Sequence, residues 1–119
     1  MQTFFNILLV ALLLYQLYNF YQIYKAPTIL PHEAKKLLNK QGVFFIDVRT
    51  KKEFENRHIK GAKNIPLNHL KKRITEIPKD VKIIVVCQSG ARSARGTMQL
   101  LKSGFKNVYS LKGGMLAWK

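Results

Sequence analysis

The feature that most constrains the fold is an uninterrupted apolar run over residues 83–86, which stops at the only cysteine of the chain, Cys87. All four residues of the run are β-branched, and no polar residue alternates with them. Such a run is typical of a central parallel strand that is covered on both faces. The apolar residues of the following segment, 93–102, have a roughly helical spacing, so we expect a helix that begins close to Arg92. The pattern therefore predicts that Cys87 lies at the carboxyl end of a buried strand.

The chain beyond residue 26 alternates short strand patterns with helical ones. We expect further strands near residues 28–30, 43–48, 64–66 and 108–109. Helices are expected after Pro31, after Thr50, where Thr50 and Glu53 have the spacing of a capping box, and from Leu67 to a stop at Pro78. Such alternation predicts a three-layer α/β/α domain with a small parallel sheet.

Charge divides the chain into two parts, because every charged side chain lies at or after Lys25. A helix over residues 3–24 would measure roughly 33 Å, close to the hydrocarbon thickness of a bilayer. Aromatic residues flank its apolar centre, as they do at membrane interfaces. We therefore predict one transmembrane anchor over residues 1–25, followed by a single domain over residues 26–119. Lysines follow the anchor and none precedes it, so the domain is expected to face the cytoplasm.

Three other structures compete with a spanning anchor over residues 3–24. A cleaved signal peptide would require a basic start and small residues at a cleavage site, and the sequence has neither. A buried core helix would need a covering layer that the rest of the chain does not supply. An interfacial helix would carry a charged face, which is missing here.

The net charge of +15 comes from 21 basic and 6 acidic residues. Nucleic-acid binding is not expected, because the basic residues resemble solvated helix faces without stacking or base-reading side chains among them. Attraction to anionic lipid headgroups and simple solubility are the alternatives that remain open. The three histidines are not clustered, so no metal site is expected.

The loop after Cys87 has the features of an anion site. Backbone N–H groups and the positive end of the next helix would converge there, which favours a cysteine thiolate. Gly90 suits a tight loop that needs a positive φ angle, and the planar fork of Arg92 would bind an anionic substrate. The alternative is that Cys87 is simply a small apolar residue that ends a strand. Asp47, at the end of the neighbouring strand, is expected to brace the loop or Arg49.

The Cys-x-x-Gly-x-Arg-Ser motif at residues 87–93 resembles the active-site loop of the rhodanese (sulfurtransferase) domain. Other segments resemble the same family in the same order, namely residues 45–49, 53–54, 58–62, 64–66, 113–114 and 117–118. The resemblance covers about residues 28–119. One departure is Asn56-Arg57, which stands where the family commonly has a glycine.

This resemblance implies a rhodanese-like α/β fold and a sulfurtransferase mechanism. Cys87 would take a sulfane sulfur from a thiosulfate-like anion, hold it as a persulfide and pass it to cyanide or to a thiol, without any cofactor. The expected substrate-binding residues are Arg92, Gln88, Ser89, Gly90, Ala91 and Ser93. The domain without its anchor is expected to be monomeric.

Two alternatives come from other functional classes. A phosphatase or an arsenate reductase would use the same cysteine and arginine, but those relatives have a Cys-x5-Arg loop, whereas Cys87 and Arg92 are separated by four residues. A non-catalytic rhodanese-like interaction module is the other alternative. The cysteine, glycine and arginine of the loop argue against it.

Overall fold

The centre of the molecule is a five-stranded parallel sheet whose middle strand is β4 (Lys82–Val86). The computed structural model describes all 119 residues. The strand order is β1-β5-β4-β2-β3, and every neighbouring pair is parallel. The other strands are β1 (Thr28–Ile29), β2 (Val43–Asp47), β3 (Lys63–Asn64) and β5 (Val108–Leu111). The predicted parallel sheet is confirmed, with the apolar run at its centre.

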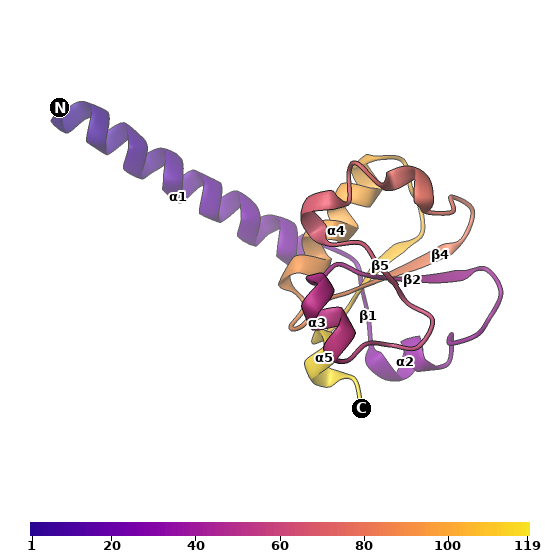
Figure 1. Cartoon of the computed structure of the whole chain (residues 1–119). Helices are drawn as coiled ribbons and strands as arrows, with labels where there is room; N and C mark the ends of the chain where they lie inside the picture. Colours follow the sequence, from indigo (N-terminus) through magenta and orange to yellow (C-terminus); the bar gives the residue numbers. More distant parts are fainter.

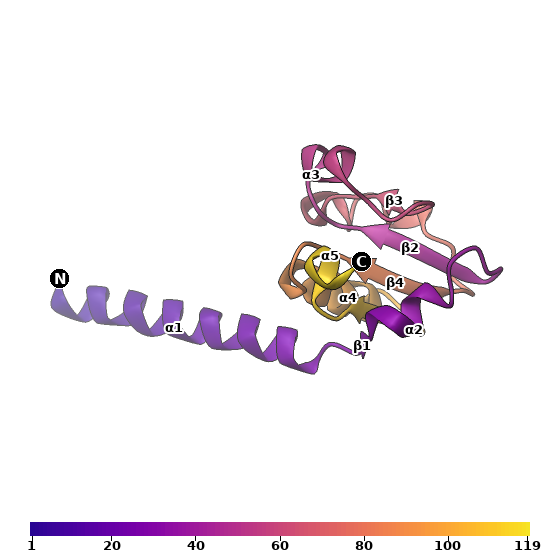
Figure 2. The ribbon, with the colours of Figure 1, turned by 90° about the horizontal axis from the view of Figure 1, so that it is seen from below.

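Helices connect the strands and lie on both sides of the sheet (Figures 1 and 2). They are α2 (Pro31–Lys35), α3 (Lys51–Asn56), α4 (Ala91–Lys102) and α5 (Gly114–Ala117). The capping box of α3 is confirmed, because the Glu53 N–H donates to Thr50 Oγ1 at 3.2 Å and the Thr50 N–H donates to Glu53 Oε1 at 3.0 Å. Each of the two side chains therefore accepts a hydrogen bond from the backbone N–H group of the other residue at the start of α3.

The prediction of a single helix between Leu67 and Pro78 is wrong. The structure has two short 3₁₀ helices there, η1 (Leu67–His69) and η2 (Ile74–Glu76). The buried residues of this region, Leu70 and Ile77, each lie three positions after the previous apolar residue, Leu67 and Ile74. These apolar residues would also lie on one face of a continuous α-helix, so their spacing alone does not distinguish an α-helix from two 3₁₀ helices.

Two separate cores explain why β4 shows no polar alternation. Ile83 and Val85 lie in a core on the α4 side of the sheet, while Ile84 and Val86 lie in a core on the opposite side, with residues from α2 and α5. These four residues of β4 are completely buried, and only Lys82, at the start of the strand, is partly exposed. Successive strand residues point to opposite faces, so a strand covered on both sides must be apolar throughout.

Helix α1 (Gln2–Lys25) extends away from the α/β domain as a long arm (Figures 1 and 2). It contacts the domain near its carboxyl end, through α4. It is the one helix whose length and composition would allow it to cross a membrane, with a mean hydropathy of 1.5, and its apolar window is not buried against the domain. The alternative of a buried core helix is therefore wrong. By length and composition, α1 is a candidate membrane anchor, and a signal sequence meets the same criteria.

Candidate active site

Cys87 follows β4 directly and lies at the carboxyl edge of the sheet, as predicted. The residue is 1% exposed and forms no disulfide. Its Sγ accepts a hydrogen bond from the Gly90 N–H at 3.0 Å, and the thiol donates to Ser93 Oγ at 3.3 Å. A merely apolar cysteine would also be buried, but it would not need these two polar neighbours. The sulfur therefore lies in a hydrogen-bonding environment.

The loop between Cys87 and α4 offers further hydrogen-bond donors. Gly90 is the N-cap of α4 and has the positive φ angle that the sequence predicted, +116°. The N–H groups of Ser89, Ala91 and Arg92 have no acceptor within the protein. Because they adjoin the amino-terminal end of a twelve-residue helix, they add to a local positive potential. The loop is thus suited to stabilise negative charge next to the sulfur.

Two serine hydroxyls connect this loop to the neighbouring strand. Ser93 Oγ donates to the Gly90 carbonyl at 3.1 Å and shares a hydrogen bond with Ser110 Oγ at 2.6 Å. Ser110 lies in β5, next to β4 in the sheet. The sequence indicated Ser93 but not Ser110, because the two lie 17 residues apart and only the strand order brings them together.

Helix α5 supports the loop from outside. The N–H groups of Met115 and Leu116 donate to the carbonyls of Cys87 and Gln88, at 2.8 and 3.1 Å. This contact is possible only with glycine at position 114, because a Cβ atom there would lie 2.4 Å from the Cys87 carbonyl oxygen. Gly114 also has a φ angle of +58°. The last helical turn therefore fixes the backbone of the loop.

Arg92 does not extend freely over the loop but forms a two-point ion pair with Glu53. Arg92 Nη1 lies 2.8 Å from Glu53 Oε1, and Nη2 lies 3.0 Å from Oε2. These hydrogen bonds lower the pKa of Glu53 to about 2, and in turn the carboxylate raises the pKa of Arg92. Glu53 thus caps α3 and also holds the guanidinium. The sequence indicated only the capping role.

A buried ion pair braces the loop from the β2 side. Arg49, 3% exposed, donates to Asp47 Oδ2 through Nη2 at 2.8 Å. Arg49 Nη1 also donates to the Gln88 side chain at 3.3 Å. The expected bracing role of Asp47 is therefore seen, since it orients the arginine that contacts Gln88.

Arg57 belongs to the Asn56-Arg57 pair that departs from the family pattern, and its side chain links α3 to α5. Its guanidinium donates to the carbonyls of Trp118 at 2.6 Å and of Met115 at 3.4 Å. The Arg57 carbonyl accepts from Arg49 Nη2 at 2.5 Å. The departure from the family pattern thus adds a support for the helix that holds the loop.

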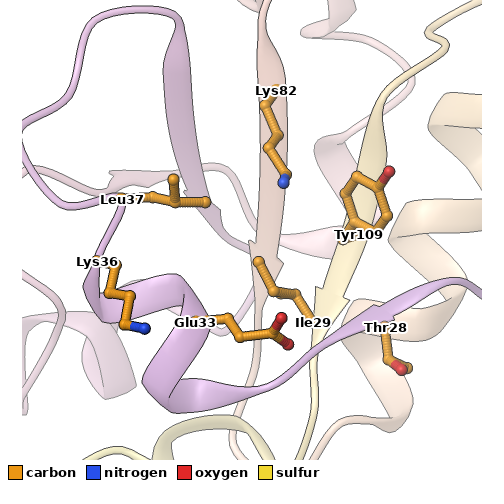
Figure 3. Close-up of a pocket in the computed structure, with 7 residues that line it drawn as sticks. All are labelled: Thr28, Ile29, Glu33, Lys36, Leu37, Lys82 and Tyr109. Carbon is orange, nitrogen blue, oxygen red and sulfur yellow. The ribbon is translucent and has the colours of Figure 1, made fainter.

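Two cavities near the sheet differ in their relation to Cys87. One, of about 320 Å³, is lined by the loop residues Ser89, Gly90 and Ala91 and by Ile23 of α1. Another, of about 370 Å³, lies between α2 and the opposite ends of β4 and β5, where Lys82 and Tyr109 line it (Figure 3). Only the first adjoins the cysteine loop, so it is the candidate entry to the site.

Two further polar residues near α3 and α4 have other surroundings. Arg95 lines a cavity between α1 and α4. The His58 ring stacks on Phe54 with 3.9 Å between ring centroids. The hydrogen bonds of Cys87 involve Gly90 and Ser93 and no histidine.

Comparison with known proteins places these features in a family. Residues 30–119 match the family described as rhodanese-like domain. The chain is 48% identical over 73 residues to protein YqhL of Bacillus subtilis, a match that covers 61% of the chain and 58% of the length of that relative. It is 34% identical over 85 residues to a sulfurtransferase of Allochromatium vinosum, covering 71% of the chain and 79% of the relative.

Solved structures agree with the sequence relatives. A rhodanese-like domain protein from Staphylococcus aureus superposes with a TM-score of 0.72 and 33% identity, covering 78% of this chain and 91% of that one. A protein from Rhodopseudomonas palustris, described as a possible tyrosine phosphatase, superposes with a TM-score of 0.73 at 24% identity, covering 84% of each chain, and shows the shared fold alone. The chain belongs to the rhodanese-like domain family, and some relatives at modest identity are sulfurtransferases.

Proposed function

We propose that the protein is a sulfurtransferase that carries a sulfane sulfur on Cys87. The observation that supports this most is the set of donors around the sulfur: the Gly90 N–H bonds to Sγ, and the N–H groups of Ser89, Ala91 and Arg92 have no acceptor in the protein. A persulfide ends in a negatively charged sulfur, which such donors stabilise. No cofactor is required, because sulfur itself is both nucleophile and leaving group.

The reaction has two half-steps. In the first, the Cys87 thiolate attacks the outer sulfur of thiosulfate, and the sulfur–sulfur bond breaks with its electron pair leaving on sulfite. In the second, cyanide or a thiolate attacks the terminal sulfur of the Cys87 persulfide, and the cysteine leaves as a thiolate. The enzyme returns to its initial state after each pair of steps, so the kinetics are ping-pong.

Arg92 is proposed to attract the anionic donor to the loop. Its side chain is 35% exposed, and its ion pair with Glu53 uses one N–H on each terminal nitrogen. Donors remain for a bound anion, because a guanidinium has five N–H groups. Glu53 orients the guanidinium but also reduces its net attraction for an anion.

The test compares two activities of one preparation. We expect thiocyanate from thiosulfate and cyanide, and no hydrolysis of aryl phosphates, because four residues between Cys87 and Arg92 form a ring suited to one sulfur atom rather than to an oxyanion. Cys87-dependent phosphate hydrolysis without thiocyanate would support the phosphatase alternative. Neither activity would support a non-catalytic interaction module.

We further propose that α1 anchors the domain to a membrane, with residues 26–119 in the cytoplasm. Support comes from its apolar surface, which the domain leaves exposed, and from the basic residues that follow it. Protease added outside intact cells should leave the domain uncut, and cleavage there would show the opposite orientation. An intact amino terminus in the mature protein would exclude a cleaved signal sequence.

A further inference from the structure

A third cavity, of about 400 Å³, lies where α1 meets the domain. Residues of α1 and of α4 line it, and Figure 1 shows the carboxyl-terminal part of α1 beside α4. Tyr18 and Gln22 line it from α1, and Lys71, Arg95 and Lys102 line it from the domain. It is separate from the cysteine loop, since it shares no lining residue with the cavity beside that loop.

The cavity gathers positive charge without a counter-ion from the protein. Lys71, Arg95 and Lys102 take part in none of the four ion pairs of the structure. Lys102 Nζ donates to the Tyr18 hydroxyl at 2.7 Å, which links α4 to α1 at this level. Three cations around one cavity favour the binding of an anion there.

Two of the residues that line the cavity carry an unpaired polar atom. Gln22 is 8% exposed, and its side-chain oxygen has no hydrogen-bond donor. The side-chain oxygen of Gln99, on α4, is likewise buried and unpaired. Leaving a buried acceptor unsatisfied is costly, so such atoms usually indicate a missing partner. The partner is expected to carry hydroxyl or ammonium donors beside its negative charge.

If α1 anchors the domain as proposed above, its geometry would place this cavity at the surface of the membrane. Residues 15–22 lie against the domain, so residues 2–14 are the part of the helix that extends freely. Thirteen residues measure about 20 Å, less than the ~30 Å of a hydrocarbon core. A helix that inserts while it remains docked therefore brings Tyr18 and the three cations into the layer of lipid headgroups.

We propose that the α1–α4 cavity binds the phosphate of an anionic phospholipid headgroup. Lys71, Arg95 and Lys102 contact the phosphate, and the Gln22 side-chain oxygen accepts from a headgroup hydroxyl. This site would fix the angle between anchor and domain. It depends on insertion of α1 and not on the chemistry of Cys87, so the two proposals fail independently.

The test uses the full chain in detergent, with phosphatidylglycerol and phosphatidylcholine offered together and bound lipid counted by native mass spectrometry. Wild-type protein should retain phosphatidylglycerol preferentially. A variant with Lys71→Gln, Arg95→Gln and Lys102→Gln should bind it at least about tenfold more weakly, because each basic residue contributes appreciably near an anionic surface.

A matched control removes the same charge elsewhere. Lys36→Gln, Lys79→Gln and Lys106→Gln also delete three cations, but these residues line cavities at the far, amino-terminal edge of the sheet. The control should bind phosphatidylglycerol as wild type does. Equal losses in both variants, or no loss in the cavity variant, would overturn the proposal. An unchanged far-ultraviolet circular dichroism spectrum and melting temperature verify that each variant is folded.

A second variant and a soluble competitor complete the test. Lys71→Glu reverses the charge of one exposed residue and should weaken binding severalfold, while Lys79→Glu should not. Glycerol phosphate should not displace the lipid at comparable concentrations, because it lacks the acyl chains that hold the headgroup beside α1. Efficient displacement would assign the cavity to a soluble phosphate compound instead of a lipid.

Discussion

The two parts of the chain place apolar side chains in opposite environments. In α1, leucines such as Leu8 and Leu12 are 53% exposed, whereas in β4 every residue from Ile83 to Val86 is 0% exposed. Residues of the domain itself cover both faces of its sheet, so the stability of the domain does not depend on α1. Helix α1 lacks such a cover and needs an apolar solvent or partner. In the proposed function, the domain supplies the chemistry and α1 supplies the location.

Deletion of residues 1–25 should separate the two roles completely. The truncated protein is expected to move from the membrane fraction to the soluble fraction and to retain its sulfurtransferase activity, because the sheet and both cores lie in residues 26–119. Fractionation and thiocyanate production measure the two effects. An aggregated or unfolded product would show that α1 belongs to the folded unit.

Cys87→Ser should remove the activity of the domain and leave its location unchanged. A serine fits the space and keeps the contacts with Gly90 and Ser93, but it cannot form a persulfide. Sulfur transfer is expected to fall by about a thousandfold or more, while membrane association and thermal stability remain those of the wild type. Residual thiocyanate production near the wild-type rate would mean that another group carries the sulfur.

Gly114→Ala tests the support of the loop by α5. The added Cβ would lie 2.4 Å from the Cys87 carbonyl oxygen, and the positive φ angle adds strain, so we expect a loss of about 2–4 kcal/mol in unfolding free energy and a clear loss of activity. Gly61→Ala is the matched control, because Gly61 has a φ angle of +88° but no atom within 4 Å of its Cβ position. It should cost only about 1–2 kcal/mol and leave activity unchanged. Similar effects of both substitutions would refute the close contact as the cause.

Arg92→Ala and Glu53→Gln should change the KM for thiosulfate in opposite directions. Loss of the guanidinium is expected to raise KM by roughly tenfold. Glutamine keeps the capping box of α3 but removes the charge that neutralises Arg92, so KM should fall severalfold. Alkylation of Cys87 by a neutral reagent serves as control and should be similar in both variants. A rise in KM for Glu53→Gln would show that orientation of Arg92 matters more than its net charge.

The smallest expected effect is that of acid on the stability contributed by the ion pair between Glu53 and Arg92. Because the folded-state pKa of Glu53 is lowered to about 2, its ion pair contributes stability above the unfolded-state pKa of roughly 4.3 and loses that contribution as the pH falls toward 2. The pair is about a third exposed, so the contribution is at most about 1 kcal/mol. The stability difference between wild type and Glu53→Gln should therefore disappear between pH 5 and about 2. A constant difference across this range would exclude the ion pair as its source.

Local patterns predicted the central part of the fold well. The β-branched run over residues 83–86, the cysteine after it and the helix that follows all lie within about twenty consecutive residues. The capping box of Thr50 and Glu53 is similarly local. Such features depend on neighbours in sequence, and sequence shows them directly.

Contacts between distant segments could not be predicted in the same way. Glu53 and Arg92 lie 39 residues apart, and Arg57 and Trp118 lie 61 apart. Each pair meets only because the strand order brings α3, the cysteine loop and α5 to one edge of the sheet. The resemblance to rhodaneses indicated Gly113 and Gly114 as a motif, but the reason for glycine at 114 required the position of the Cys87 carbonyl.

The central claim is that Cys87 carries the transferred sulfur, and the mass of the peptide that contains it tests this most directly. After incubation with thiosulfate, we expect this peptide to gain the mass of one sulfur atom. Subsequent cyanide should remove that mass and release thiocyanate in equal amount. A Cys87 peptide of unchanged mass in a preparation that produces thiocyanate would contradict the account.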